Sequence, residues 1–229
     1  MTAATLKKIA MITMFIDHLG AIFFPSYLSL RIIGRIAFPI FAFLLVEGSF
    51  KTSNKTKYIL RIFTFALITE IFFDLAFFQG LDFGHQNILF TFTLGLLMVY
   101  SFKKINFNTK ALNIYSHLLI VIIFSCLAIF FKFDYQYLGI LTIFYFYLFR
   151  IKVIAKNGLV LLLIITYSIT SFEFPFFSIN IPIQALAIFS LFFILNYNGK
   201  KGGLNPYFVY GFYPGHLAIL ILINLVLRW

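Results

Sequence analysis

Long apolar runs separated by short polar stretches cover the sequence from one end to the other. Several runs are close to the length of about 20 residues that a helix needs to cross the hydrocarbon core of a bilayer. Their continuity excludes a membrane β-barrel, whose strands alternate apolar and polar residues. We therefore predict an all-α, polytopic transmembrane helical bundle that forms a single domain over residues 1–229. The nine expected helices span about 5–24, 28–49, 57–79, 87–102, 112–131, 136–150, 157–173, 181–197 and 207–228. The runs at 87–102, 136–150 and 157–173 are short, so we expect tilted or re-entrant segments there.

Lysine and arginine are concentrated at the N-terminus and in every second loop between these runs. The residues are Lys7 and Lys8, then Lys51, Lys55 and Lys57, then Lys103, Lys104 and Lys110, then Arg150, Lys152 and Lys156, and finally Lys200 and Lys201. The positive-inside rule therefore predicts a cytoplasmic N-terminus and an external C-terminus. Because these loops account for much of the net charge of +11, we expect no nucleic-acid partner. The expected partner is the lipid bilayer of a bacterial inner or cytoplasmic membrane.

Six of the ionisable residues inside the apolar runs are the main candidates for a polar site, because a charge there costs roughly 2.5–3.5 kcal/mol on insertion scales. They are Asp17, His18, Arg31, Arg35, Glu70 and Asp74. The predicted orientation places both arginines at the depth of the three acids, and buried charges must pair. Two interpretations stay open at this point. The arginines and carboxylates either lock the first three helices together or form part of a functional site.

His18 differs from the other five residues because imidazole is the usual general base near neutral pH. Asp17 points about 100° away around the same helix. We therefore expect Glu70 or Asp74 to orient the His18 ring. The alternative is a structural histidine bonded to a backbone carbonyl.

Lys7 lies eleven residues before His18, almost three helical turns, so the two side chains share a helix face. A cation at the membrane rim and a base deeper inside suit a long ligand with a phosphorylated head and a reactive tip, such as acyl-coenzyme A. Lysines at cytoplasmic helix ends also serve as simple anchors.

His216 follows Tyr213, Pro214 and Gly215, which interrupt an apolar run. Helix breaks inside membranes often open onto a polar cavity. The depth of His216 depends on where its helix begins: near the middle for a start at Tyr207, and at the rim for a start at Pro214. We expect no metal site.

Several motifs in the sequence resemble the TraX family of integral membrane proteins. They are Leu6-Lys7 with Met14, Asp17-His18-Leu19-Gly20, FFP at 23–25, RIIGRIAFPIFAFLLVEG at 31–48, EIFFDLAF at 70–77, QNILFTFTLGLL at 86–97 and YPGHLAIL at 213–220. The resemblance is close over the first hundred residues and looser at the end, and 103–205 carries no recognisable motif. The family resembles type-3 membrane acyltransferases, in which a basic residue, ten intervening residues and a histidine mark the first helix. Lys7 and His18 have this spacing.

The resemblance implies acyl transfer, with acetyl-coenzyme A as the co-substrate. The founding member of the family acetylates the N-terminus of a conjugative pilin. A pilin-like N-terminus or an envelope glycan is therefore an expected acceptor, although the sequence itself carries no acceptor information.

The resemblance also suggests roles for the polar residues. Lys7 would lie near the phosphates, with His216 also assigned to the coenzyme site. His18 would act as the base or relay the acetyl group, Arg31 or Arg35 would stabilise the oxyanion, and Glu70 or Asp74 would orient His18. Asp17 completes the predicted catalytic set. Two other hypotheses stay open: a proton- or ion-coupled transporter that uses the same charges, and a non-catalytic membrane scaffold.

Overall fold

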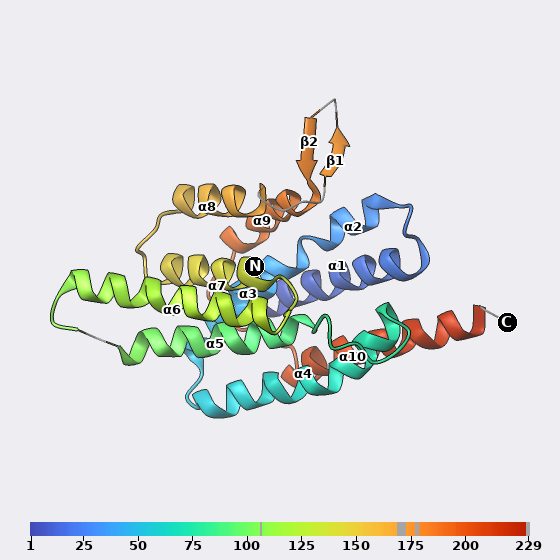
Figure 1. The fold of residues 1–229 in the computed structure, drawn as a ribbon, viewed down its shortest axis with the longest axis horizontal. Coiled ribbons are helices and arrows are strands. Elements are labelled where there is room, and N and C mark those ends of the chain that lie inside the picture. Colours follow the sequence, from blue (N-terminus) through green and yellow to red (C-terminus); the bar gives the residue numbers. More distant parts are fainter. Residues whose placement is uncertain (106, 169–172, 177–178, 228–229) are drawn as a thin grey trace.

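The computed structural model describes residues 1–105, 107–168, 173–176 and 179–227 (Figure 1). Its helices are α1 (Ala3–Phe23), α2 (Leu28–Gly34), α3 (Ala37–Lys51), α4 (Lys55–Phe77), α5 (Ile88–Lys104), α6 (Lys110–Phe130), α7 (Gln136–Arg150), α8 (Lys156–Ser168), the 3₁₀ helix η1 (Ile183–Phe189), α9 (Ser190–Leu195) and α10 (Pro206–Leu227). A short antiparallel hairpin, β1 (Glu173–Phe176) and β2 (Ile179–Pro182), projects from the bundle. The predicted all-α bundle is confirmed.

Side-chain caps mark the starts of several helices, because the first N–H groups of a helix lack partners within it. The Asn54 side chain accepts from the backbone N–H of Lys57 at 2.8 Å, and the Asn87 side chain accepts from that of Leu89 at 3.0 Å. Asn54 and Asn87 thereby fix where α4 and α5 begin.

The predicted helix at 28–49 is two helices, and Pro39 explains the division. A proline has no N–H to bond the carbonyl four residues earlier, and its ring crowds that carbonyl. Here that carbonyl belongs to Arg35, and α2 ends at Gly34 while α3 begins at Ala37. The break lets the side chain of Arg35 leave the helix axis toward the interior.

The described part of the predicted helix at 157–173 is α8, Lys156–Ser168; residues 169–172 lie outside the described residues. The predicted helix at 181–197 is corrected, because this segment is divided among β2, η1 and α9. Among the described residues, three stretches are long and apolar enough to cross a membrane: Leu28–Lys51 taken together, α6 and α10. The full nine-span topology and its orientation stay predictions.

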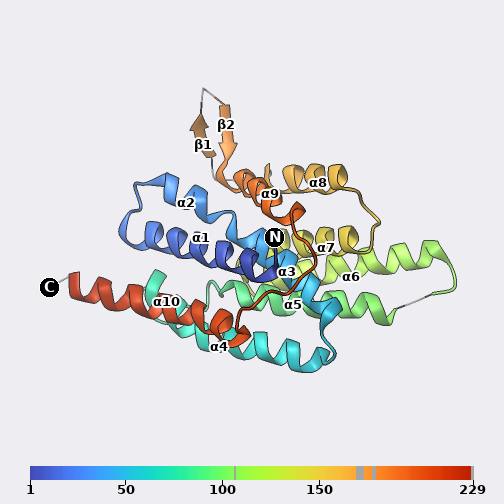
Figure 2. The ribbon, with the colours of Figure 1, turned by 180° about the vertical axis from the view of Figure 1, so that it is seen from behind.

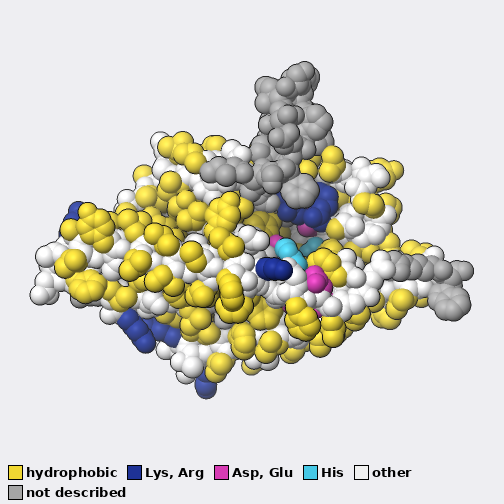
Figure 3. All heavy atoms as spheres, in the orientation of Figure 1, with side chains coloured by type: hydrophobic (Ala, Val, Ile, Leu, Met, Phe, Trp, Pro, Cys, Tyr) yellow, Lys and Arg dark blue, Asp and Glu magenta, His cyan; other side chains and the backbone are white. Residues whose placement is uncertain are grey.

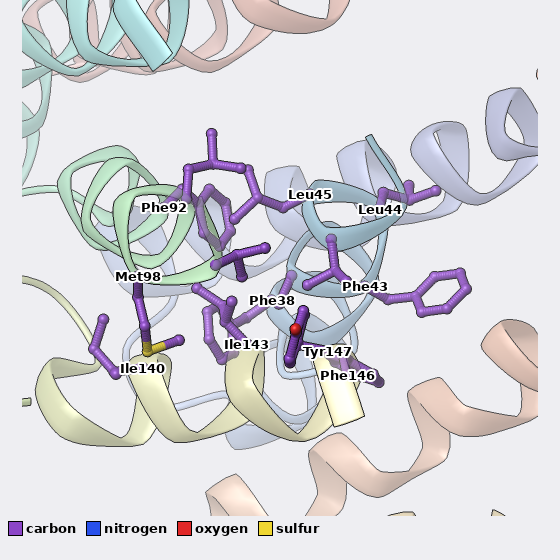
Figure 4. Close-up of a cluster of buried hydrophobic side chains, with 14 of the residues drawn as sticks. Phe38, Phe43, Leu44, Leu45, Phe92, Met98, Ile140, Ile143, Phe146 and Tyr147 are labelled. Atoms are coloured by element: carbon purple, nitrogen blue, oxygen red, sulfur yellow. The ribbon is translucent and has the colours of Figure 1, made fainter. Parts of the chain in front are cut away.

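The largest core cluster lies among α3, α5 and α7, where aromatic and branched side chains interdigitate (Figure 4). Its members include Phe38, Phe43, Phe92, Met98, Ile140, Ile143, Phe146 and Tyr147. Gly95 lets α5 approach α7 closely, because a Cβ there would lie 2.3 Å from Cδ1 of Ile143. Helix α10 packs along α4 and against α1 on the other side of the bundle (Figure 2).

The face of the molecule shown in Figure 3 is largely apolar, as expected of a protein that is surrounded by lipid. Helix α6 carries many of the exposed side chains, among them Leu119 at 58% and Ile122 at 58% exposure. Histidine, acidic and basic side chains gather instead in a hollow on the face shown in Figure 3.

Candidate functional site

Asp17 and His18 are neighbours near the end of α1, and their side chains contact different helices. Asp17 pairs with arginines of the α2 region, whereas His18 contacts α10. This divergence follows from the turn of about 100° between successive helical residues, and it confirms the prediction that Asp17 does not orient His18.

The Asp17 carboxylate binds both arginines. Arg35 Nη2 lies 2.7 Å from Oδ1 and 2.8 Å from Oδ2, and Arg31 Nη1 lies 3.1 Å from Oδ2. Gly34 permits this approach of α1 to α2, because a Cβ there would lie 2.2 Å from the Asp17 Cβ. The pairing of arginines with a carboxylate inside the first helices is confirmed for Asp17.

Arg35 uses all of its N–H groups inside the protein. Besides Asp17, it donates through Nε to the Arg31 carbonyl at 3.1 Å. Through Nη1 it donates to the Tyr135 hydroxyl and to Gln184 Oε1, each at 3.3 Å. Tyr135 and Gln184 lie far away in the sequence, and no sequence pattern indicated their contact with Arg35. Arg35 therefore holds α1, α2, the start of α7 and η1 together, and it has no N–H left for a substrate.

Glu70 and Asp74 do not contact the arginines, so the predicted pairing is wrong for these two acids. Glu70 Oε2 accepts from the Asn87 backbone N–H at 2.9 Å and from its side-chain amide at 2.6 Å. Asp74 Oδ2 accepts from the backbone N–H of Asp82 at 3.0 Å. Both acids tie α4 to the segment before α5. Depth in the membrane was predicted from loop charges, but the direction of these side chains around α4 was not.

His18 pairs with His216 of α10, and not with Glu70 or Asp74 as predicted. The distance from His18 Nδ1 to His216 Nε2 is 2.7 Å, and the two rings stack at 4.9 Å with an interplanar angle of 14°. Phe77 contacts the His18 ring edge-on at 5.3 Å, and the Tyr213 ring lies 5.8 Å away. His216 is 4% exposed, near the middle of an α10 that is continuous from Pro206.

The hydrogen bonds of His216 determine the tautomers of both rings. Nδ1 of His216 lies 2.7 Å from the Phe212 carbonyl oxygen, which only accepts, so this nitrogen carries the proton. In a neutral ring Nε2 of His216 is then the acceptor, and Nδ1 of His18 is the donor. Nε2 of His18 is therefore left with its lone pair, as a general base requires.

His18 lines a half-open cavity of about 560 Å³, here called the histidine cavity. Its polar lining consists of Asp17, His18, Arg31, Arg35, His85, Asp134, Tyr135 and Tyr213. Figure 3 shows histidine, acidic and basic side chains gathered in a hollow of the apolar surface. His216 does not line this cavity and lies behind His18, an arrangement that suits positioning better than the predicted coenzyme contact.

Lys7 lines a second cavity of about 400 Å³, here called the basic cavity, together with the cations Lys51, Arg61 and Lys201. The loop that carries Lys201 is held against α1, since the backbone N–H of Ala4 donates to the Lys201 carbonyl at 3.0 Å. The sequence analysis used Lys201 only as an orientation signal and did not consider Arg61.

The two cavities are neighbours because five residues line both. These residues are Met14, Phe41, Ile88, Phe92 and Tyr213. Lys7 and His18, about 16 Å apart along α1 by helical rise, thus lie in adjoining cavities. Among the five shared residues, only Tyr213 carries a hydrogen-bond donor on its side chain.

His85 and Asp134 face each other on another wall of the histidine cavity. His85 Nε2 lies 3.6 Å from Asp134 Oδ1. His85 belongs to the loop between α4 and α5. The nearby Asp134 carboxylate raises the pKa of His85 above its ordinary value of 6.5, against the opposing effect of partial burial.

An apolar exterior, long apolar helices and charged side chains gathered around two cavities define a helical membrane protein with a polar site. The chain belongs to the TraX protein family, which matches residues 2–224.

Two relatives extend this finding. A protein of Dichelobacter nodosus described as "Probable fimbrial assembly protein FimC, serogroup H1" is 30% identical over 96% of this chain and 94% of its own length. An uncharacterized protein of Rickettsia prowazekii (strain Madrid E) is 35% identical over 52% of this chain and 44% of its own length. No solved structure matches the chain.

Proposed function

We propose that this protein is an integral membrane acetyltransferase that transfers the acetyl group of acetyl-coenzyme A to an amine or hydroxyl acceptor. The observation that carries the proposal is the free Nε2 of His18, held by the hydrogen-bond chain through His216 to the Phe212 carbonyl. A base of fixed tautomer beside a cavity, next to a second cavity lined by cations, suits transfer from a phosphorylated donor.

In this mechanism the coenzyme occupies the basic cavity, with its phosphates near Lys7, Arg61 and Lys201. Cations near a phosphorylated head supply binding energy remote from the reacting carbon. The thioester lies at the shared wall, where the Tyr213 hydroxyl is available as a donor to the carbonyl oxygen. Arg31 stays a candidate for the same role, whereas Arg35 does not, because its N–H groups are all in use.

The acceptor enters the histidine cavity and His18 Nε2 removes its proton as the acceptor nitrogen or oxygen attacks the thioester carbon. The carbon–sulfur bond breaks, and the proton held by His18 passes to the leaving sulfur. The printed description of the Dichelobacter nodosus relative, a fimbrial assembly protein, favours a pilin-like acceptor. An envelope glycan hydroxyl has the same chemistry.

The test uses the full chain in nanodiscs, with radiolabelled acetyl-coenzyme A and two acceptor probes, a short peptide with a free N-terminus and methyl glucoside. We expect saturable coenzyme binding and acetyl transfer to one of the probes. His18→Asn keeps a hydrogen-bonding side chain, so folded yield and coenzyme binding should persist. Loss of proton transfer should lower the rate by about 10²–10⁴-fold.

Lys7→Ala should weaken coenzyme binding and leave the rate at saturation nearly unchanged, because a remote phosphate contact supplies uniform binding. Lys8→Ala is the matched control, since Lys8 is exposed and lines neither cavity. Transfer by His18→Asn at the wild-type rate would overturn the mechanism. Proton-coupled flux in liposomes without coenzyme binding would instead support a transporter.

A further inference from the structure

Two cations and one acid make direct contact in the ion cluster around Asp17, where two guanidinium groups share one carboxylate. The other acid on the cavity wall, Asp134, acts on both arginines only from a distance, and its Oδ1 lies 3.6 Å from His85 Nε2. Glu70 and Asp74 are bonded to the segment before α5 and do not line the cavity. Two guanidinium groups with a single carboxylate in direct contact attract a further anion, because charges in low-dielectric surroundings are stabilised by close partners of opposite sign.

Arg31 is the member of the cluster with binding capacity left. Its Nη1 donates to the Asp17 carbonyl oxygen and contacts Oδ2, each at 3.1 Å. Within the described part of the chain, its Nε and Nη2 have no hydrogen-bond partner. The Arg31 side chain is 32% exposed against 16% for Arg35, and it lines the histidine cavity.

We propose that Arg31 binds an anionic group of the acceptor, a carboxylate or a phosphate, and so directs the acceptor's nucleophile toward His18. This inference rests on the proposed acetyl transfer and adds the chemical class of the acceptor. The free N–H groups on Nε and Nη2 form the side of a guanidinium that binds two oxygens of one anion in parallel. Arg31 and His18 line the same cavity, so one small acceptor of suitable length reaches both.

The arrangement also selects against neutral acceptors. A neutral molecule in the cavity would displace water from the guanidinium without replacing its hydrogen bonds. A site built to bind a polar group discriminates strongly against analogues that lack this group, because its own buried polar atoms are then left unpaired.

The experiment measures kcat/KM for two matched acceptor pairs with the full chain in nanodiscs: phosphoethanolamine against ethanolamine, and glycine against glycinamide. We expect the anionic member of at least one pair to be preferred by about tenfold or more. The pair that shows the preference identifies phosphate or carboxylate as the recognised group. Inorganic phosphate or acetate should inhibit transfer competitively with the acceptor and not with the coenzyme.

Arg31→Gln should abolish this preference, because the rate for anionic acceptors should fall much further than the rate for neutral acceptors. Arg31→Lys should retain part of the preference, since the charge remains but the paired N–H geometry is lost. Lys132→Gln is the control for general electrostatics. It removes one charge from the loop that carries Asp134 and Tyr135, but Lys132 does not line the cavity.

Equal rates within both pairs for the wild type would overturn the acceptor inference and leave the acetyltransferase proposal standing. An equal loss for all acceptors in Arg31→Gln would also overturn it, because this result fits a role at the oxyanion or in folding. If neither the wild type nor His18→Asn transfers acetyl groups to any probe, both the proposed function and the acceptor inference are overturned. If Arg31→Gln does not fold, the acceptor inference is tested by two measurements on the wild type: its preference for anionic acceptors and its competitive inhibition by phosphate or acetate.

Discussion

The contact with His216 makes His18 suitable as a base, because an imidazole accepts a proton only through a nitrogen that carries none. The Phe212 carbonyl determines the protonation of His216, which in turn determines that of His18. His216 is therefore a positioning residue, and its effect should appear in turnover and not in coenzyme binding.

His216→Phe keeps an aromatic ring against His18 but removes the acceptor nitrogen, so the His18 tautomer is no longer fixed. We expect kcat to fall by roughly 10–100-fold, the range found when a group that orients a histidine is lost, with coenzyme affinity unchanged. His216→Gln keeps an acceptor and should recover part of the rate. Wild-type kcat and an unchanged pH–rate profile in His216→Phe would contradict the positioning role.

The Asp17–Arg35 ion pair makes a second prediction at this scale. Arg35→Leu and Asp17→Asn should each destabilise the protein by roughly 3–5 kcal/mol, because each leaves a buried partner uncompensated. In a double-mutant cycle, the two changes should couple by about 1–3 kcal/mol. Glu70→Gln with Arg35→Leu is the control pair and should be additive, since these residues do not touch. Additive losses for Asp17 and Arg35 would show that the pair does not form.

At the scale of the helices, most elements were predicted correctly, because an apolar run of helical length indicates a helix surrounded by lipid. The division at Arg35 was not predicted. Pro39 indicated it, but the apolar run continues on both sides of the break and was taken as one helix. The partners of the buried charges were predicted only where they lie close in the sequence, as for Asp17 and the arginines. The contacts of His18 with His216 and of Glu70 with Asn87 depend on how α10 and α4 are rotated, which no local pattern records.

The close approach of α1 and α2 at Gly34 is testable by adding one methyl group. In Gly34→Ala the new Cβ would lie 2.2 Å from the Cβ and Oδ1 of Asp17, so α1 or α2 must shift. We expect a loss of about 1–3 kcal/mol from overpacking and weaker acceptor binding. Gly211→Ala in α10 is the control, because nothing lies within 4 Å of the added Cβ, and its stability should be equal or higher. The two variants are compared by thermal unfolding in detergent, and equal unfolding temperatures would argue against the close contact.

At the scale of the whole molecule, the alternating loop charges predict the orientation of the bundle. A reporter fused after Trp229 should be active outside the cytoplasm, and a reporter inserted at Lys200 should be active inside. A cytoplasmic C-terminus would show that one of the short segments does not span.

The His85–Asp134 contact predicts a pH dependence of the stability of the whole molecule. The folded pKa of His85 is raised, so the stabilisation is fully present below the unfolded value of about 6.5 and is lost as the pH rises through the folded pKa. His85→Asn should therefore lower the unfolding temperature at about pH 5.5 and have less effect at about pH 8.5. Thermal unfolding of both proteins across this range is the measurement. A difference that grows with pH would contradict the assignment.

The five residues that line both cavities leave only one layer of side chains between them. If water reaches both cavities, the membrane potential falls mainly across this layer and not across the full bilayer. Moving one elementary charge through such a layer is worth up to about 2.3 kcal/mol per 100 mV. In the predicted orientation, the proposed transfer carries a proton inward, from the acceptor through His18 to the sulfur of the coenzyme. A potential that is negative inside would then accelerate acetylation, so the energised state of the membrane would itself regulate the reaction.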